Sequence, residues 1–238
     1  MELTEKELAR KFDHTFLKAY AQDADLEKLC REAKEIRAAM VAINTEWVPF
    51  CKKQLEGSDV HVGAAISFPL GQSGLESKLF ETQDAIDKGA DEIDYVIHIG
   101  KAKMHDWDYL ENEMKLITDL CKANHIISKV IFENCYLDDE EIVELSKIAS
   151  RVKPDFIKTS TGFGPSSATA KDVRLMKANC GSDVKVKAAG GIRSWADCKK
   201  MLEAGADRIG TSASLRILEE FRSGKEESSS KPDESESY

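Results

Sequence analysis

The chain has 238 residues, of which 42% are hydrophobic and 32% charged, and its formal net charge is −9. This composition is typical of a globular protein with one sizeable core and excludes a disordered or fibrous chain. No basic face or basic amphipathic stretch is present, so we expect neither nucleic acid nor a membrane surface as a partner. No apolar run approaches the roughly 18 residues that a membrane-spanning helix needs.

The six cysteines form no C-x-x-C pair, and no histidine stands at metal-ligand spacing from any of them. We therefore expect no metal site and no other cofactor. The segment Met1–Lys6 lacks the apolar region of a signal peptide. Four of the cysteines lie in helical patterns, as small core residues do. Both observations favour a reducing, cytoplasmic location.

Short β-branched runs alternate with longer amphipathic runs over residues 1–222. The runs with strand character are Phe12–Phe16, Met40–Asn44, His61–Ser67, Glu92–His98, Lys129–Glu133, Phe156–Ser160, Val184–Ala188 and Arg208–Thr211. The runs with helical periodicity are Asp23–Arg37, Glu46–Leu55, Glu76–Lys88, Trp107–Ala123, Asp139–Arg151, Ala170–Asn179, Trp195–Ala204 and a last helix from Ser214.

Strands that alternate with helices imply a parallel sheet. Eight such units with short connections predict a single-domain α/β protein, a (β/α)8 TIM barrel with a short N-terminal helix. A short repeat supports this reading, because Gly89 and Gly205 each stand just past a helix and before a strand, where a left-handed residue is favoured. The alternative is a doubly wound open sheet, but no G-x-G-x-x-G motif follows the first strand.

Residues 223–238 contain no aliphatic side chain and carry five carboxylates against two lysines. This composition predicts a disordered acidic tail after the domain of residues 1–222. The tail ends in Tyr238, whose hydroxyl can donate or accept a proton. We weigh an auxiliary role for Tyr238 at the barrel mouth against the simpler reading of a solvated tail.

Three lysines lie inside strand patterns, namely Lys129, Lys158 and Lys187. Lysine is among the residues least often buried, and two lysines that converge on one site lower each other's pKa. A neutral amine is a nucleophile for carbonyl carbons. The alternative is that these side chains lie along apolar surface and expose their charges at the strand ends.

The acidic candidate is Asp94, which strand alternation places on the same face as His98. A carboxylate beside two lysines can move protons and keep one of the lysines charged. A buried structural ion pair is the other reading of Asp94. His98 is an auxiliary candidate as a proton relay, although such a histidine is more often only hydrogen-bonded.

Glycine-rich turns follow the seventh and eighth predicted strands, at residues 190–193 and 210–213. Backbone N–H groups in such turns and at a helix N-terminus bind anions, and these two loops are the usual phosphate seat of a (β/α)8 barrel. The pair Thr161-Gly162, after the sixth strand, can close a third side. We therefore predict a phosphate site at this end of the barrel.

These residues together resemble the deoxyribose-phosphate aldolase family, whose members are class I aldolases with a (β/α)8 fold. The resemblance runs from about Phe12 to Leu218 and is carried by seven ordered motifs. They are Phe12-Asp-His-Thr-Phe-Leu-Lys18, Ser67-Phe-Pro-Leu-Gly71, Gly89-Ala-Asp-Glu-Ile-Asp94, Lys129-Val-Ile-Phe-Glu133, Phe156-Ile-Lys-Thr-Ser-Thr-Gly162, Val186-Lys-Ala-Ala-Gly-Gly-Ile-Arg193 and Arg208-Ile-Gly-Thr-Ser212.

The resemblance implies metal-independent, reversible cleavage of 2-deoxy-D-ribose 5-phosphate to D-glyceraldehyde 3-phosphate and acetaldehyde, in deoxyribonucleotide catabolism. In the same way, Lys158 matches the imine-forming lysine, Lys187 the lysine that tunes it, and Asp94 the proton-shuttling aspartate. The positions that match the phosphate loops are Gly162, Gly190, Gly191, Ile192, Arg193, Gly210 and Ser212.

The sequence departs from the family's usual pattern at residues 44–47, at His98, at residues 72–74 and at Ala213. These departures bear on substrate preference and phosphate affinity and leave the predicted imine residues intact. Two alternatives stay open: another phosphate-binding Schiff-base aldolase or transaldolase with a different donor, and a non-catalytic protein that kept the barrel. A homodimer is the base-rate expectation for the assembly.

Overall fold

The structure is a computed structural model of the whole chain, and it describes residues 3–224. Residues 1, 2 and 225–238 lie outside the described residues, and with them Tyr238 and nearly all of the expected tail. The last described helix ends at Ser223, and Gly224 follows it in a left-handed conformation.

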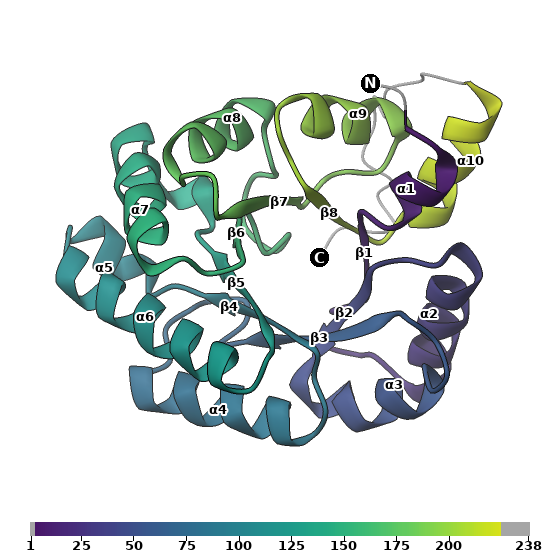
Figure 1. Ribbon diagram of the computed structural model, residues 1–238, viewed down its shortest axis with the longest axis horizontal. Helices are drawn as coiled ribbons and strands as arrows, with labels where there is room; N and C mark the ends of the chain where they lie inside the picture. Colours follow the sequence, from purple (N-terminus) through teal and green to yellow (C-terminus); the bar gives the residue numbers. More distant parts are fainter. Residues whose placement is uncertain (1–2, 225–238) are drawn as a thin grey trace.

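Eight parallel strands close into a barrel in which each strand pairs with its neighbours in the sequence, and the first strand pairs with the last (Figure 1). The predicted (β/α)8 architecture is therefore confirmed. The strands are β1 (Phe12–Thr15), β2 (Met40–Asn44), β3 (His61–Ile66), β4 (Glu92–Val96), β5 (Ile127–Ile131), β6 (Phe156–Lys158), β7 (Lys185–Ala189) and β8 (Arg208–Thr211).

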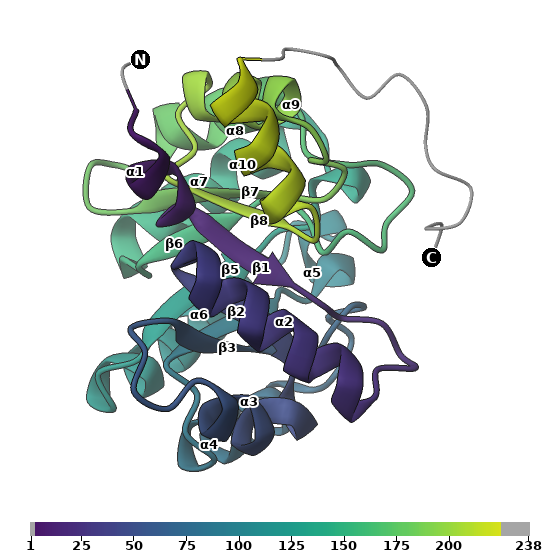
Figure 2. The ribbon, with the colours of Figure 1, turned by 90° about the vertical axis from the view of Figure 1, so that its right-hand side faces the viewer.

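The helices surround the barrel, and Figure 2 shows α2 and α10 on either side of β1, where the barrel closes. The short N-terminal helix expected from the sequence is α1. The helical segments are α1 (Glu5–Ala9), α2 (Asp23–Ile36), η1 (Thr45–Trp47), α3 (Val48–Gln54), α4 (Leu75–Asp87), α5 (Ile99–Lys103), α6 (Trp107–Ala123), η2 (Asn134–Tyr136), α7 (Asp139–Val152), α8 (Ala170–Asn179), α9 (Trp195–Glu203) and α10 (Ser214–Ser223).

Local signals explain where these helices begin and end. The side chain of Asp138 accepts a hydrogen bond from the backbone N–H of Glu141 at 2.9 Å, and the Glu141 carboxylate accepts one from the Asp138 N–H. This reciprocal pair satisfies two N–H groups that a helix start leaves without partners. Gly89 and Gly205 follow the C-terminal ends of α4 and α9 with φ of 101° and 109°, which is the left-handed conformation that the repeat predicted.

Strand alternation separates two kinds of interior. Outward-facing residues such as Val41, Ile93 and Val186 are fully buried in the hydrophobic core between strands and helices. Inward-facing positions at the centre instead hold charged side chains, among them Glu92 and Lys129, which are also fully buried. The centre of this barrel is therefore a charged layer surrounded by an apolar one.

Two strand boundaries differ from the sequence prediction in a way that matters for the site. The fifth strand begins at Ile127, so Lys129 lies in its middle rather than at its start. The fourth strand ends at Val96 rather than at His98, because His98 is the N-cap of helix α5, which begins at Ile99. In the barrel ladder, Lys129 lies opposite Asp94.

A buried ion pair behind β4 ties two helices to the end of that strand. Lys78 of α4 lies 2.7 Å from a carboxylate oxygen of Glu113 on α6, and both side chains are fully buried. The Lys78 ammonium also donates to the carbonyl of Val96 at 2.7 Å, and Glu113 accepts from the N–H of His98 at 3.1 Å. The pair thus fixes the backbone at the point where β4 leads into α5.

We predict that Lys78→Met lowers the free energy of unfolding by about 3–5 kcal/mol, because it leaves the Glu113 carboxylate buried without a cation. Urea unfolding followed by circular dichroism measures this change. The double variant Lys78→Met/Glu113→Leu removes both charges and should recover most of the loss. A single variant as stable as the unmodified chain would show that the pair does not hold this part of the fold.

Candidate active site

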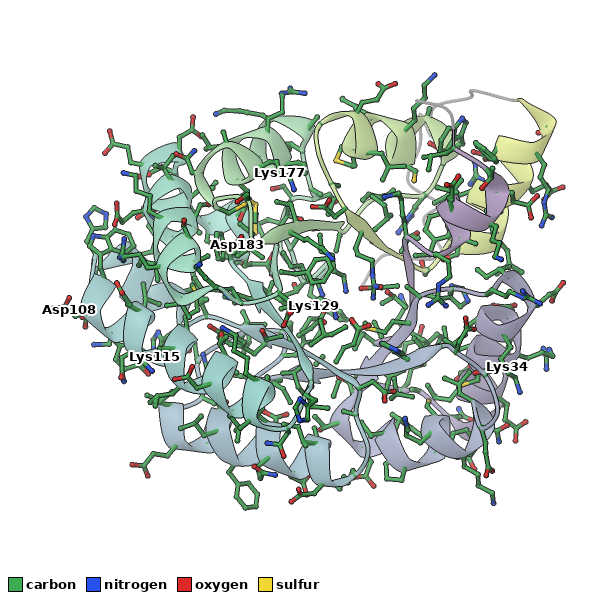
Figure 3. The ribbon with its side chains drawn as sticks, viewed as in Figure 1. Lys34, Asp108, Lys115, Lys129, Lys177 and Asp183 are labelled. Atoms are coloured by element: carbon green, nitrogen blue, oxygen red, sulfur yellow. The ribbon has the colours of Figure 1, made fainter. Side chains whose placement is uncertain are left out.

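Three lysines from neighbouring strands converge on one carboxylate, that of Asp94 in β4. The ammonium nitrogen of Lys129 lies 2.7 Å from Asp94 Oδ1. Those of Lys158 and Lys187 lie 3.0 Å and 2.7 Å from Oδ2. The barrel register produces this geometry, because Asp94 is opposite Lys129, and Lys158 is opposite Lys187. In Figure 3, Lys129 lies within the ring of strands, whereas Lys34, Asp108 and Lys115 lie on the outer helices.

Burial and charge together set the protonation of this group. Burial lowers the pKa of Lys158 to about 8, with repulsion from Lys187 adding to the effect and Asp94 opposing it. Burial alone would raise the pKa of Asp94, but the three ammonium groups hold it well below its usual range. The pKa of Lys129 is raised despite burial, because carboxylates surround it. The lowered pKa makes the neutral amine of Lys158 available near neutral pH.

A second layer of charges lies closer than Asp94 to the N-terminal ends of the strands, and sequence reasoning missed it. Lys187 contacts Asp13 Oδ2 at 2.5 Å, and Arg208 donates to Asp13 Oδ1 at 2.7 Å. Arg208 also lies 3.0 Å from Glu92, and Glu92 in turn pairs with Lys129. Strand periodicity could have revealed this layer, since Glu92 precedes Asp94 by two residues and so points to the same side of β4.

Lys158 also lines a cleft formed by the loops after β6, β7 and β8. This cleft brings together every residue of the predicted phosphate site and Thr161. Those residues are Thr161, Gly162, Gly190, Gly191, Ile192, Arg193, Gly210 and Ser212. Thr15 and Leu17, at the end of β1, line the same cleft and were not singled out from the sequence.

Two glycines of this cleft are required by its geometry. Gly191 has φ of 71°, and a Cβ there would lie 2.4 Å from the hydroxyl of Ser167. A Cβ at Gly210 would lie 3.1 Å from Cε of Lys187 and 2.9 Å from Cβ of Ala189. The first glycine allows the turn of the loop, and the second leaves room for the Lys187 side chain beneath it.

Thr161 is held at the edge of the cleft by a buried carboxylate. Its N–H donates to Glu133 Oε1 at 3.1 Å, and its hydroxyl makes a short hydrogen bond to Oε2. Burial raises the pKa of Glu133, and the two hydrogen bonds from Thr161 oppose that rise. The loop after β6 is thereby fixed relative to the segment that follows β5.

The structure places His98 outside β4. It is the N-cap of α5, where its ring nitrogen Nδ1 accepts from the N–H of Lys101 at 3.3 Å. Its ring packs edge-on against Tyr109, with the ring centres 5.9 Å apart. The expectation that His98 shares a face with Asp94 was therefore wrong, because the backbone leaves the strand before reaching it.

Other sequence-level expectations concern metals, cysteines and membranes. All six cysteines are free thiols, and five of them are buried. Over residues 3–224, no group of three or more histidine, cysteine or carboxylate side chains is arranged to hold a metal ion. In the same range, no helix combines the length and apolarity needed to cross a membrane.

The closed barrel, with lysines and an aspartate buried next to a glycine-rich cleft, is the framework of a barrel lyase. A family model described as DeoC/LacD family aldolase matches residues 8–218. The chain belongs to this family of aldolases and is an enzyme of the carbon–carbon lyase class.

Individual relatives cover nearly the whole chain. A deoxyribose-phosphate aldolase from Lactobacillus acidophilus is 54% identical over 93% of this chain and 94% of its own length. One from Bacteroides thetaiotaomicron is 47% identical over 92% of both chains. Among solved structures, the tetrameric deoxyribose phosphate aldolase from Aeropyrum pernix superposes with a TM-score of 0.86 at 32% identity, covering 92% of this chain and 93% of that one.

The low pKa of Lys158 predicts a pH-dependent stability. Between pH 8 and about 10.4, Lys158 is neutral in the folded chain and charged in the unfolded one, so the unfolded chain binds more protons and stability rises with pH. Lys158→Met removes this buried charge and should stabilise the fold at pH 7 by on the order of 2–3 kcal/mol.

That gain should shrink as the pH rises from 8 to about 10.4, which urea unfolding at a series of pH values measures. The control is Lys53→Met, which replaces an exposed lysine on α3 and should give no such trend. A gain for Lys158→Met that is the same at pH 7 and pH 10.4 would contradict the assigned burial of the charge.

Proposed function

We propose that this chain reversibly cleaves 2-deoxy-D-ribose 5-phosphate to D-glyceraldehyde 3-phosphate and acetaldehyde through an imine on Lys158. The observation that carries the proposal is the position of Lys158, which is buried beside Asp94 and lines the cleft of glycine-rich loops. The names of the relatives from Lactobacillus and Bacteroides support the same substrate.

In this mechanism the neutral amine of Lys158 attacks the aldehyde carbon of the open-chain sugar and forms a carbinolamine. A proton delivered to the carbinolamine hydroxyl lets it leave as water, and a protonated imine results. Splitting the reaction through a covalent intermediate replaces one difficult carbanion step with easier ones. The lowered pKa of Lys158, about 8, makes the attacking form available near neutral pH.

Asp94 and Lys187 supply and accept the protons. Asp94 Oδ2 contacts both Lys158 and Lys187, so the carboxylate connects the nucleophile to a second ammonium group. When the proton of the C3 hydroxyl is removed, the C2–C3 bond breaks and its electrons move into the protonated imine. D-Glyceraldehyde 3-phosphate leaves, the resulting enamine is protonated at C2, and hydrolysis of the new imine releases acetaldehyde.

The phosphate group is proposed to bind in the loops after β6, β7 and β8, away from the bond that breaks. Backbone N–H groups of glycine-rich turns and the hydroxyl of Ser212 are the donors that such a dianion takes. Binding energy gained at this remote group positions the aldehyde carbon over Lys158.

A cytoplasmic location and a homodimeric assembly remain predictions. Light scattering of the purified chain tests the homodimer.

Borohydride trapping tests the imine. Incubation with acetaldehyde and borohydride should add one ethyl group to Lys158, identified by peptide mass spectrometry. Lys158→Ala should lose the adduct and Lys53→Ala, at an exposed position on α3, should keep it. No adduct on folded protein would overturn the proposal. An adduct with dihydroxyacetone but none with acetaldehyde would assign the imine to an aldolase with a different donor.

The phosphate assignment predicts a selective defect. Ser212 is exposed in the cleft, and Ser212→Ala removes one hydroxyl donor without creating a cavity. Loss of a hydrogen bond to a charged group should raise KM for 2-deoxyribose 5-phosphate about tenfold. Steady-state kinetics with unphosphorylated 2-deoxyribose serves as the control and should be unchanged. An equal effect on both sugars would contradict phosphate binding at Ser212.

A further inference from the structure

The charged side chains at the barrel centre form a closed ring of alternating sign. Starting from Asp94, the ring runs through Lys187, Asp13, Arg208, Glu92 and Lys129, and returns to Asp94. Each neighbouring pair in this ring is in ion-pair contact. We call these six residues, from Asp94 to Lys129, the charge ring. Lys158 lies beside the ring, and the seven residues together come from six strands.

The charge ring is neutral by itself, with three cations and three carboxylates. Lys158 is a seventh charged group, and it contacts the ring only through the Asp94 oxygen that Lys187 also contacts. Protonated Lys158 therefore gives the buried group one positive charge more than it has carboxylates. A surplus charge away from water is costly, and the group removes it most easily by releasing the Lys158 proton.

We propose that Arg208 is a positioning residue that completes the charge ring from the far end of the barrel and thereby makes Lys158 the surplus cation. This inference rests on the proposed function, because it concerns how the same nucleophile is prepared. Arg208 touches neither Lys158 nor the glycine-rich cleft. It acts through Asp13 and Glu92, which it holds at 2.7 Å and 3.0 Å.

The alternation gives Arg208 a definite electrostatic effect. Without its charge, the seven groups would hold three cations and three carboxylates, so a charged Lys158 would be balanced and would keep its proton to higher pH. Removal of the Glu92 charge has the opposite sign, since four cations would then face two carboxylates. Removal of both charges restores one surplus cation, as in the unmodified chain.

Other titratable groups border these seven without entering the ring. His61 of β3 lies 2.8 Å from Glu92, and Glu133 faces Lys158 from the end of β5 while it binds Thr161. Lys185 of β7 approaches Arg208 only across the ring of Phe156, which lies 5.5 Å from Lys185 Nζ and 5.6 Å from the Arg208 guanidinium carbon. None of these bordering groups is altered in the variants below.

The test measures the titration of Lys158 in Arg208→Met, Glu92→Gln and the double variant. Competitive acetylation with acetic anhydride, resolved by peptide mass spectrometry across a pH series, gives the midpoint for Lys158 in each. We expect a shift on the order of one pH unit upward in Arg208→Met and downward in Glu92→Gln. The double variant should return to the midpoint of the unmodified chain.

A purely structural role for Arg208 predicts a different pattern. The Lys158 midpoint would stay constant, activity would fall equally at every pH, and the double variant would be the most impaired. Any of those results for folded protein would overturn the inference. Arg208→Lys keeps the charge and should retain the original midpoint, which tests the inference even where Arg208→Met fails to fold.

A small cation added in solution can also substitute for the Arg208 side chain. It lines a cavity of about 830 Å³ at the N-terminal ends of the strands, together with residues of α1. In Arg208→Ala, added methylguanidinium should restore the Lys158 midpoint, whereas urea, which is similar in shape but neutral, should not. Equal effects of the two compounds would contradict a role for the charge.

Failure of the inference and failure of the proposed function can be told apart. Acetylation reports the titration of Lys158 whether or not the chain is an aldolase. If borohydride traps acetaldehyde on Lys158 but the midpoints do not move, the imine stands and the role of Arg208 is wrong. If the midpoints move as expected but no imine forms, the charge ring stands and the aldol mechanism is wrong.

Discussion

Alternating charges buried at the centre of the barrel are the constraint on which the rest of this structure depends. Removing an ion from water costs several kcal/mol, and only well-placed partners offset that cost. A parallel barrel meets this demand because every strand points alternate side chains at the same small interior. Asp13, Glu92 and Asp94 meet four cations there, and each contact joins residues from different strands. The strand register therefore determines both the fold and the protonation of the site.

The proposed mechanism assigns different tasks to two regions of the site. In that mechanism the barrel interior supplies the neutral amine of Lys158, and the loops after β6, β7 and β8, which line the cleft, bind the phosphate. Lys158 lines the cleft and contacts Asp94, so it connects the two regions. A buried lysine with a lowered pKa reduces the stability of the fold, a common cost of a reactive group. The apolar layer between strands and helices offsets that cost.

The sequence predicted most of the architecture, because strand and helix periodicity repeat eight times and glycines such as Gly89 mark the ends of helices. It also singled out Lys158, Lys187 and Asp94, partly from their positions in strand patterns and partly from family resemblance. It did not reveal the contacts of Arg208 with Asp13 and Glu92. Periodicity places Glu92 on the same side of β4 as Asp94, but the partners of Arg208 depend on how strands that lie far apart in the chain come together in the barrel.

The account's central claim is that Lys158, and not Lys129, loses its proton near pH 8. The most direct measurement is a carbon-13 NMR titration of the lysine Cε signals, with Lys158 assigned by comparison with Lys158→Arg. The account predicts a midpoint near pH 8 for Lys158, while Lys129 stays charged throughout the range in which the fold is stable. A midpoint for Lys158 near the usual lysine value of about 10.4, or titration of Lys129 before Lys158, would contradict it.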